Sequence, residues 1–308
     1  MKFVKQLSIV VPVYNDQEVL HELHRRLNEV LPQIADEYEI VMVDDGSCDK
    51  SWPVMCQLKE SDEHVVAVKL SRNFGQQNSI AAGLSVAKGD VIVLMDSDLQ
   101  DRPEDIPVLL NRLEESGAQM AIAQWQSRQD TGFKKFVSKL FFVVSDKITD
   151  IHVLPRLGNF RAMRRSVLDE LKNFPEKTAT TMSLLYYIGN NYVPVPLTRD
   201  ARFAGKSGYN LRKMLGLTFA RIFSFSLFPI RLATYSGFCM TGLSLIVALI
   251  LILRWFFSNV APGWTSMIVL ILFLSGLNFA FLGIIGEYLG KIFLETKQRP
   301  RFVIETIK

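Results

Sequence analysis

Two long runs without charge constrain this sequence more than any other feature. Residues 232–253 include no charged side chain, and residues 255–286 include none either, with a break at Pro262 and Gly263. About 20 apolar residues are enough to cross a bilayer as a helix. A pair of buried helices in a soluble protein is the alternative, but two such runs close together make it a poor one. The sequence therefore predicts two transmembrane helices joined by a short turn.

Basic residues flank these runs and predict their orientation. Lys and Arg precede the first run and follow the second, whereas Arg254 alone lies between them. Because basic residues favour the cytosolic side, we expect both ends of the chain in the cytosol. The net charge of +4 is concentrated beside the spans, which favours a membrane surface and not nucleic acid as the partner. Pro12, Asn15 and Asp16 interrupt the apolar stretch near the N-terminus, so we expect a strand there and no signal peptide.

The region before the spans alternates between two periods. Five Val- and Ile-rich segments are expected as strands, at 7–13, 39–43, 65–70, 91–95 and 120–123. Helical periods lie between them, with start signals at Asp16, Ser51 and Asp101 and a stop signal at Gly117. This alternation predicts an α/β fold with a mostly parallel sheet covered by helices.

The pattern changes after the fifth expected strand. Residues 124–208 are irregular, which is typical of an acceptor site or a lid. Residues 209–231 form an amphipathic stretch rich in Phe and Arg, as expected of helices at a membrane interface. We therefore divide the chain into a cytosolic α/β domain (1–208), juxtamembrane helices (209–231), a transmembrane region (232–289) and a cytosolic tail (290–308).

A cluster of acidic residues follows the fourth expected strand. Asp96 and Asp98 are separated by one serine and lie at the carboxyl end of that strand. Ligands of open α/β sheets bind at this edge, and paired carboxylates there can hold a hard divalent cation that grips a diphosphate. Helix capping is the alternative and accounts for Asp101. An EF-hand calcium loop does not fit, because the position that requires glycine holds Asp101.

Polar turns also follow the first two expected strands. Tyr14 and Asn15 end the first, and Asp44 and Asp45 end the second. A carboxylate at this edge can accept hydrogen bonds from a ribose or a base, and Tyr14 can lie against the base. Each turn alone is ordinary turn chemistry, but three on one edge predict a nucleotide site. There is no GxGxxG and no Walker A loop, which argues against dinucleotide binding and P-loop hydrolysis.

Taken together, these motifs resemble family 2 glycosyltransferases of the polyprenyl-phosphate branch, which includes dolichol-phosphate mannose synthases and bactoprenol-phosphate glucosyltransferases. The matching segments are VPVYN (11–15), VDDGS (43–47), SRNFG (71–75), DSDLQD (96–101), GNFR (158–161), RFAG (202–205) and GEYLG (286–290). The resemblance covers essentially the whole chain. It implies a GT-A fold, Mg²⁺ or Mn²⁺, and inverting transfer of a hexose from a nucleotide-diphosphate sugar, expected to be UDP-linked, to a membrane polyprenyl phosphate such as undecaprenyl phosphate. The implied location is the bacterial inner membrane, and the implied use is cell-envelope glycosylation, including lipopolysaccharide.

The resemblance also implies roles for individual residues. It assigns the metal and the diphosphate to Asp96, Asp98 and Gln100. It assigns the nucleoside sugar to Pro12, Tyr14, Asn15, Asp44, Asp45, Arg72 and Asp96. A lipid phosphate dianion needs fixed positive charge, and the candidates for it are Lys134, Lys135, Arg161, Arg199, Arg202 and Lys206. Each of these cations has an alternative as a solvated surface charge or a contact to lipid headgroups.

The residues expected to act in catalysis are Asp98, Asn159 and Arg161. Asn159 departs from the family pattern, in which many relatives have Asp, and Trp125 lies where a basic pair is often found. A phosphate monoester has a second pKa of about 6, so at neutral pH it is already ionised and needs no general base. We therefore expect Asn159 to orient the acceptor or the sugar, and Trp125 to alter the donor pocket.

Two other functions are open from the sequence. A processive polysaccharide synthase would need a Gln-x-x-Arg-Trp motif and more spans, and residues 124–128 read Gln-Trp-Gln-Ser-Arg instead. A catalytically silent membrane scaffold that binds nucleotide sugar is the second alternative, motivated by Asn159. Gly276, Gly283 and Gly286 allow close helix packing, and we expect a homo-oligomer.

Overall fold

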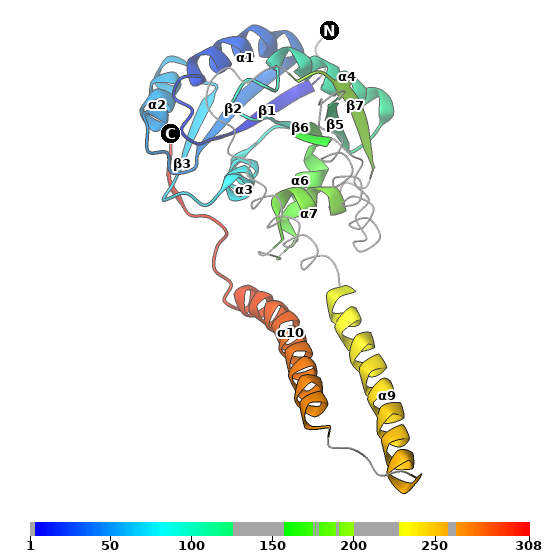
Figure 1. Cartoon of the computed structure of the whole chain (residues 1–308). Helices are drawn as coiled ribbons and strands as arrows, with labels where there is room; N and C mark the ends of the chain where they lie inside the picture. Colours follow the sequence, from blue (N-terminus) through cyan, green and yellow to red (C-terminus); the bar gives the residue numbers. More distant parts are fainter. Residues whose placement is uncertain are drawn as a thin grey trace.

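The computed structural model describes residues 4–125, 157–174, 176, 179–188, 191–199, 228–257 and 263–308. In this part of the chain a single sheet forms the centre of the globular region (Figure 1). Its strands are β1 (Val4–Val13), β2 (Ala35–Asp44), β3 (Val65–Leu70), β4 (Val91–Leu94), β5 (Met120–Trp125), β6 (Leu157–Arg164), β7 (Tyr192–Leu197) and β8 (Ile304–Ile307). Their order is β7-β5-β6-β4-β1-β2-β3-β8. The pairs β1–β2, β1–β4, β2–β3 and β5–β7 are parallel, whereas β6 and β8 run antiparallel to their neighbours.

Helices cover both faces of the sheet, and each face has its own core. The first face carries α1 (Leu20–Ile34), α2 (Ser51–Ser61) and α4 (Ile106–Ser116), and the second carries α3 (Gln76–Val86), α6 (Arg165–Lys172) and α7 (Thr181–Ile188). Successive side chains of a strand point to opposite faces. In β2, Ile40 and Met42 therefore enter the first core, and Val41 and Val43 enter the second. This double burial explains why the parallel strands are apolar almost throughout.

The sequence signals locate most helix ends. Helix α2 begins at Ser51 as expected, and α4 ends at Gly117, whose φ of +62° is left-handed. A short 3₁₀ turn, η1 (Pro103–Asp105), precedes α4. Helix α1 begins only at Leu20, because the Asp16 carbonyl first accepts the Val19 N–H in a turn at 3.1 Å. The start signal at Asp16 therefore marks that turn.

Three strands lie outside the five that the sequence predicts. Strand β7 includes Pro194 and Pro196, which cannot donate to a ladder and which disguise a strand. They are accommodated because β7 is the edge strand of the sheet. Strand β6 inserts antiparallel between β4 and β5 and has a polar, glycine-containing start. Strand β8 is short and lies at the C-terminal end of the chain. The residues of the expected tail, from 290 on, include the last turns of α10, which continues to Thr296, and β8.

Two long helices extend from the globular region as a hairpin (Figure 1). Helix α9 (Phe228–Phe257) has 30 residues and α10 (Trp264–Thr296) has 33. Within the described residues, one stretch is long and apolar enough to cross a membrane, Phe273–Thr296 of α10, with a mean hydropathy of 1.4 and no burial inside the structure. The second predicted span is not confirmed by this criterion. The predicted juxtamembrane helices lie outside the described residues, apart from the first turn of α9.

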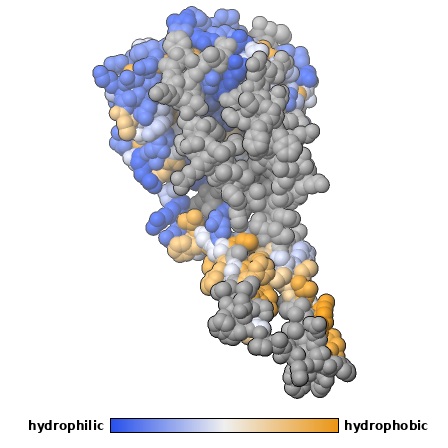
Figure 2. Space-filling model, in the orientation of Figure 1, coloured by the Kyte–Doolittle hydropathy of each residue, from blue (hydrophilic) through white to orange (hydrophobic). Residues whose placement is uncertain are grey.

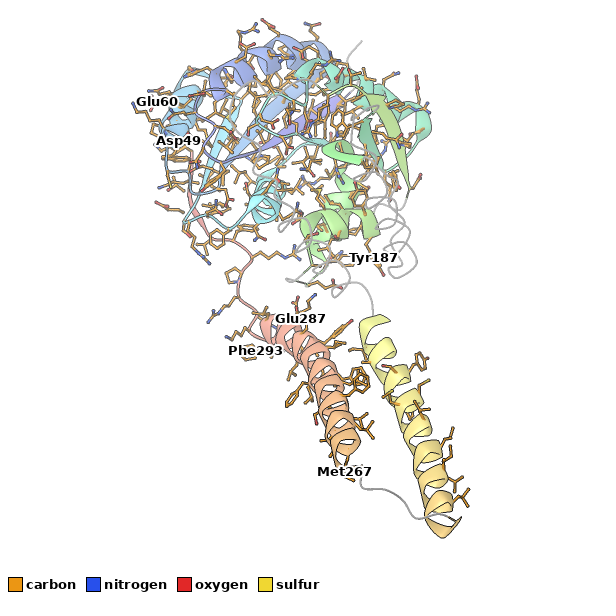
Figure 3. All side chains as sticks on the ribbon, viewed as in Figure 1. Asp49, Glu60, Tyr187, Met267, Glu287 and Phe293 are labelled. Carbon is orange, nitrogen blue, oxygen red and sulfur yellow. The ribbon has the colours of Figure 1, made fainter. Side chains whose placement is uncertain are left out.

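The surface follows the same division. Figure 2 shows hydrophilic residues over the globular region and hydrophobic ones along the two helices. Phe238 of α9 and Phe279 of α10 are each 73% exposed. In Figure 3, Met267 lies near the end of α10 far from the sheet, whereas Glu287 and Phe293 lie near the opposite end. The charged residues of α10 are therefore on the side of the globular domain.

Candidate active site

The carboxyl ends of three central strands meet at one edge of the sheet. Strand β1 lies between β2 and β4, and Val13 pairs with Asp44 while Val10 pairs with Leu94. The turns that follow these strands are therefore neighbours. A hydrogen bond from the Ser97 hydroxyl to an Asp16 carboxylate oxygen joins the turns after β4 and β1. The structure thus brings together the three polar turns singled out in the sequence.

The turn after β1 is fastened to the turn after β2. The Asn15 N–H donates to Ser47 Oγ at 3.0 Å, and Asn15 Oδ1 accepts from the Cys48 N–H at 2.8 Å. Asn15 has a φ of +55°, a left-handed conformation that Asn tolerates better than most residues. Its side chain is therefore used to shape this edge. Beside it Tyr14 is 47% exposed, which leaves its ring accessible to a ligand.

The two adjacent acids of the second turn have different environments. Both oxygens of Asp45 are occupied, because they accept the N–H groups of Phe74 and Gly75 at 2.8 and 2.9 Å. Burial raises the pKa of the Asp45 carboxyl, and these two hydrogen bonds oppose the shift. Asp44 Oδ1 accepts the Ser47 N–H at 3.1 Å, whereas its buried Oδ2 has no hydrogen-bond partner in the described part of the chain. A ligand N–H or O–H could satisfy Asp44, but Asp45 holds a loop.

That loop, residues 71–75, closes over the turn after β2. Gly46 has a φ of +67°, and a Cβ there would lie 2.5 Å from the Asn73 backbone nitrogen. Only glycine therefore allows the loop to approach so closely. Within the loop, the Arg72 guanidinium lies 4.5 Å from the centre of the Phe74 ring. Arg72, expected to assist the donor, is thus at the nucleotide edge and is exposed.

Three side-chain donors surround the carboxylate of Asp96. Gln76 Nε2 at the start of α3 donates to Asp96 Oδ1 at 2.9 Å, and Asn159 Nδ2 of β6 approaches the same oxygen at 3.4 Å. Arg199, just beyond β7, forms an ion pair with Asp96 Oδ2 at 3.5 Å. Donors from three distant parts of the chain therefore converge on one acid.

The turn that carries Asp98 is strained and anchored. Asp98 Oδ1 accepts the Gln100 N–H at 3.2 Å, which closes a local turn. Leu99 between them has a φ of +58°, which is unusual for a bulky residue, and its side chain is only 3% exposed. Burial of the leucine side chain offsets the backbone strain. The Gln100 side chain, expected to help bind the metal, is half-buried in this turn.

Asp101 adds a third, buried carboxyl group to the acidic cluster. Its side chain is 1% exposed, one oxygen accepts the Asp96 N–H at 3.2 Å, and the other is buried without a hydrogen bond. Burial, reinforced by the charge of Asp96, raises the pKa of Asp101 to about 7. Arg199 Nε lies 3.7 Å from the unbonded oxygen and opposes that shift.

This cluster fits a hard divalent cation of the Mg²⁺ or Mn²⁺ type. Asp96 and Asp98 supply carboxylate oxygens beside the buried oxygen of Asp101, and oxygen ligands are what such ions prefer. The described residues hold no group of three His, Cys, Asp or Glu side chains arranged to enclose an ion. Mg²⁺ commonly takes one or two carboxylates and completes its shell with substrate phosphates and water. The site therefore fits an ion that arrives with a diphosphate.

Arg199 reaches the acids across an aromatic platform. Its guanidinium lies 5.3 Å from the centre of the Trp125 ring. The indole in turn packs on Gly158, where a Cβ would lie 2.5 Å from Trp125 Nε1. The resemblance assigned Arg199 to the acceptor phosphate, which stays a prediction; the structure places its guanidinium against Asp96 and Asp101. Trp125, flagged as a departure from the family pattern, supports that placement.

Arg161 is buried beneath the site. The residue is 1% exposed, and its guanidinium donates to the carbonyls of Gly158 and Asn159 at 2.9 and 3.1 Å and to the Tyr186 hydroxyl at 3.1 Å. These contacts fix the backbone that carries Asn159. The geometry therefore gives Arg161 a positioning role, while its Nη1 is buried without a hydrogen bond in the described part of the chain and its predicted contact with a phosphate stays a prediction.

The remaining expectations fall partly outside the described residues. Pro12 lies within β1, paired with Val43. The acceptor candidates that cannot be placed are Lys134, Lys135, Arg202 and Lys206, which lie outside the described residues. Gln76 was missed in the sequence, although its place directly after the loop that follows β3 puts it on the same sheet edge. This position after a strand was the sequence signal that could have identified Gln76 as a site residue.

Comparisons with known proteins agree with this architecture. A family model described as glycosyl transferase family 2 matches residues 8–172. The chain is 38% identical to an uncharacterized glycosyltransferase (YkcC) of Bacillus subtilis strain 168, over 97% of this chain and 93% of that protein. It is 35% identical to the bactoprenol glucosyl transferase of Shigella phage SfX, over 98% of this chain and 100% of that protein.

A solved structure resembles the globular region. Mannosyl-3-phosphoglycerate synthase from Rubrobacter xylanophilus aligns with a TM-score of 0.51 at 16% identity, over 70% of this chain and 71% of that chain. At this identity the likeness concerns the fold alone. It agrees with the GT-A architecture that the sequence motifs imply.

Proposed function

Because the chain belongs to glycosyl transferase family 2, we propose that it transfers a hexose from a nucleotide-diphosphate sugar to the phosphate of a membrane polyprenyl phosphate. The observation that carries this proposal is the acidic cluster of Asp96, Asp98 and Asp101 beside the nucleotide turns at one sheet edge. The likeness over the whole chain to bactoprenol glucosyl transferases supports the lipid acceptor.

The donor is proposed to be a UDP-linked hexose held between the turns after β1 and β2. Asp44 Oδ2 is a buried acceptor without a hydrogen bond in the described part of the chain, and a ribose hydroxyl or a base N–H would satisfy it. Tyr14 offers an exposed ring to the base. Asp45 acts indirectly, through the loop 71–75.

The diphosphate is proposed to lie at Asp96 and Asp98, which would hold Mg²⁺ or Mn²⁺ with it. Such a cation, when bound, offsets the negative charge that develops on the leaving diphosphate. Gln76 and Asn159 orient the Asp96 carboxylate by hydrogen bonds to Oδ1. Arg199 supplies a guanidinium that can shift from the acids to the diphosphate, because both are anionic oxygen acceptors.

The nucleophile is proposed to be an oxygen of the lipid phosphate. That group is largely ionised at neutral pH, so attack on C1 of the sugar needs no general base, which is consistent with Asn159 in this place. Attack opposite to the departing diphosphate inverts the configuration at C1. The protein then contributes by positioning and electrostatics.

The two long helices are proposed to cross the bacterial inner membrane, with the globular domain in the cytosol. The chain leaves the sheet after β7 and rejoins it at β8. The start of α9 and the end of α10 must therefore lie on the same side of a membrane as the sheet. The helices α9 and α10 therefore either both cross the bilayer or both stay on the side of the globular domain. Exposed apolar side chains on both helices, such as Phe238 and Phe279, favour two crossings. The domain would then face the phosphate of a lipid acceptor.

A substitution on the acidic cluster tests the proposal. In membranes supplied with undecaprenyl phosphate and a panel of labelled sugar nucleotides, Asp98→Asn should lower lipid-linked product at least about 100-fold, because the cation that would hold the diphosphate loses a charged ligand. Asp90→Asn is the matched control, since it makes the same change at the exposed opposite end of β4. Undiminished product in Asp98→Asn, or full activity under exhaustive chelation, would contradict the proposal.

A further inference from the structure

The end of the chain is built into the globular domain. Strand β8 runs antiparallel to β3, with Val68 opposite Ile307 and Lys69 opposite Thr306. The N–H groups of Ala67 and Lys308 donate to each other's carbonyls at 3.0 and 2.9 Å. Without β8, β3 would be the edge strand of the sheet, paired with β2 on one side and with no strand on the other.

Side chains anchor β8 on both of its faces. Phe302 and Ile304 pack against the core on the second face of the sheet. On the other face, Lys69 Nζ forms an ion pair with Glu305 at 3.0 Å, and the Lys69 and Lys308 ammonium groups each lie 5.9 Å from the Trp52 ring. The pairing is therefore specific in register and is more than a loose tail contact.

A short connection joins this strand to α10. The helix ends at Thr296, and the chain turns at Gln298, which has a left-handed φ of +48°. Residues 297–303 can span at most about 25 Å when fully extended. The end of α10 is therefore tied to the edge of the sheet by this segment, which Figure 1 shows running from α10 to the C-terminus beside β3.

The residue just before β8 touches the start of the loop 71–75. The Ser71 N–H, directly after β3, donates to the Val303 carbonyl at 3.0 Å. Further along this loop, the N–H groups of Phe74 and Gly75 bind Asp45. The loop is thus held at one end by the chain that leaves α10 and at the other by the nucleotide edge.

We propose that β8 is a positioning element of the donor site, which couples the end of α10 to the loop 71–75 and keeps that loop in place on Asp45. The proposal rests on the proposed function only in treating this loop as part of the donor site. Phe302 and Ile304 are the positioning residues, because their burial holds β8 on the sheet.

Hydrogen exchange of the full-length chain in lipid nanodiscs tests this coupling. The decisive amides are those of Phe74 and Gly75, which bond to Asp45 and not to β8. Ile304→Asn should loosen β8 and accelerate their exchange about tenfold, by raising the population of the open loop. Ile307→Asn is the matched control, because it makes the same change in the same strand at a side chain that is 52% exposed, and its loop exchange should stay close to wild type.

A truncation that removes residues 301–308 completes the test, since it deletes the strand whether or not Ile304→Asn releases it. Acceleration at Phe74 and Gly75 in both variants, with a raised KM for the donor and a smaller change in kcat, supports the proposal. Unchanged exchange at these amides while β3 loses protection at Ala67 would overturn it. Because exchange is measured without substrate, absence of sugar transfer in all proteins would count against the proposed function and leave the coupling result intact.

Discussion

Asp96 is the residue at which the electrostatics of the site meet. It accepts hydrogen bonds from Gln76 and Asn159 and pairs with Arg199, which also lies near Asp101. Arg199 therefore offsets part of the negative charge that a divalent cation would otherwise offset. Its side chain is 31% exposed and rests on Trp125, so it can leave the acids without disturbing the core.

Removal of this guanidinium should strengthen metal binding in the absence of nucleotide. In Arg199→Gln the acids face an incoming cation without competition, and we expect the affinity for Mn²⁺ alone to rise about tenfold, which corresponds to about 1.4 kcal/mol. Titration of Mn²⁺ followed by electron paramagnetic resonance measures this directly. Arg165→Gln, a change in an arginine that pairs with Asp169 on α6, is the control. Equal or weaker Mn²⁺ binding in Arg199→Gln would show that Arg199 does not compete with the ion.

A carboxylate at position 159 should make the fold depend on metal. Asn159→Asp replaces an amide donor, 3.4 Å from Asp96 Oδ1, with a second negative charge. We expect a lower Tm without metal and a larger increase of Tm on addition of Mn²⁺ than in the wild type, because a ligand stabilises the state that binds it. Thermal unfolding with and without Mn²⁺ checks this, and Asn173→Asp at the exposed end of α6 should show neither effect. The idea fails if both variants respond to the ion equally.

At the scale of elements, one acid ties α1, α2 and β3 together away from the site. Asp62, directly after α2, accepts hydrogen bonds from Asn28 at 2.9 Å and from the rings of His24 and His64 at 2.7 and 2.8 Å. The His64 ring stacks on Tyr38 with centroids 4.2 Å apart. Burial by itself raises the pKa of Asp62, but these hydrogen bonds together hold it well below its usual range.

The sign of the pH dependence follows from that lowered pKa. Stability from Asp62 is present above the pKa of the unfolded chain, about 3.9, and is lost as the pH falls toward the lower folded value. Asp62→Asn should therefore cost about 2 kcal/mol at pH 7, and the difference from wild type should begin to shrink as the pH falls below about 4. Glu60→Gln, an exposed acid on α2 (Figure 3), is the control. Denaturant unfolding at several pH values makes the comparison, and a difference that grows in acid would contradict this account.

At the scale of the whole molecule, the return of the chain to its own sheet determines the topology. Because β7 and β8 belong to one sheet, the end of α9 and the start of α10 are the described parts of the hairpin farthest from the domain (Figure 1). With two crossings, these helix ends lie outside the cell and the sheet lies inside.

Cysteine labelling distinguishes an arrangement in which α9 and α10 both cross the membrane from one in which neither does. The chain has three cysteines, Cys48, Cys56 and Cys239. In a variant in which these three cysteines are replaced, Ser258→Cys, which follows α9 directly in the sequence, should react with a membrane-impermeant maleimide in intact bacteria. Cys48 restored alone should react only after the cells are opened. Protection of Ser258→Cys in intact cells would contradict two crossings.

Much of this architecture follows from local patterns in the sequence. Val- and Ile-rich apolar segments predict β1 to β5, and the two charge-free runs predict the helices α9 and α10, because each signal is contained within about 30 consecutive residues. The placement of Asp96, Asp98, Asp44 and Asn15 on one edge follows from a general rule, since parallel strands bring their carboxyl ends together.

Tertiary structure decided which of these groups have partners. Asp44 and Asp45 are adjacent and chemically identical, yet Asp45 is occupied by the loop 71–75 and Asp44 is not. Arg161 and Arg199 are both arginines near the site, but one is buried under Asn159 and the other faces Asp96. No local pattern distinguishes them, because the difference depends on residues that are distant in sequence.

The last strand shows this division most clearly. By itself, the sequence determined the first five strands, the helices between them and the edge at which polar residues gather, because short-range periodicity and strand direction are enough for that. Only the tertiary structure decided that β8 completes the sheet at β3, where Lys69 meets Glu305 at a separation of 236 positions. A contact of that range is selected by shape, burial and hydrogen bonding in the folded chain, and it leaves no periodic trace in either segment.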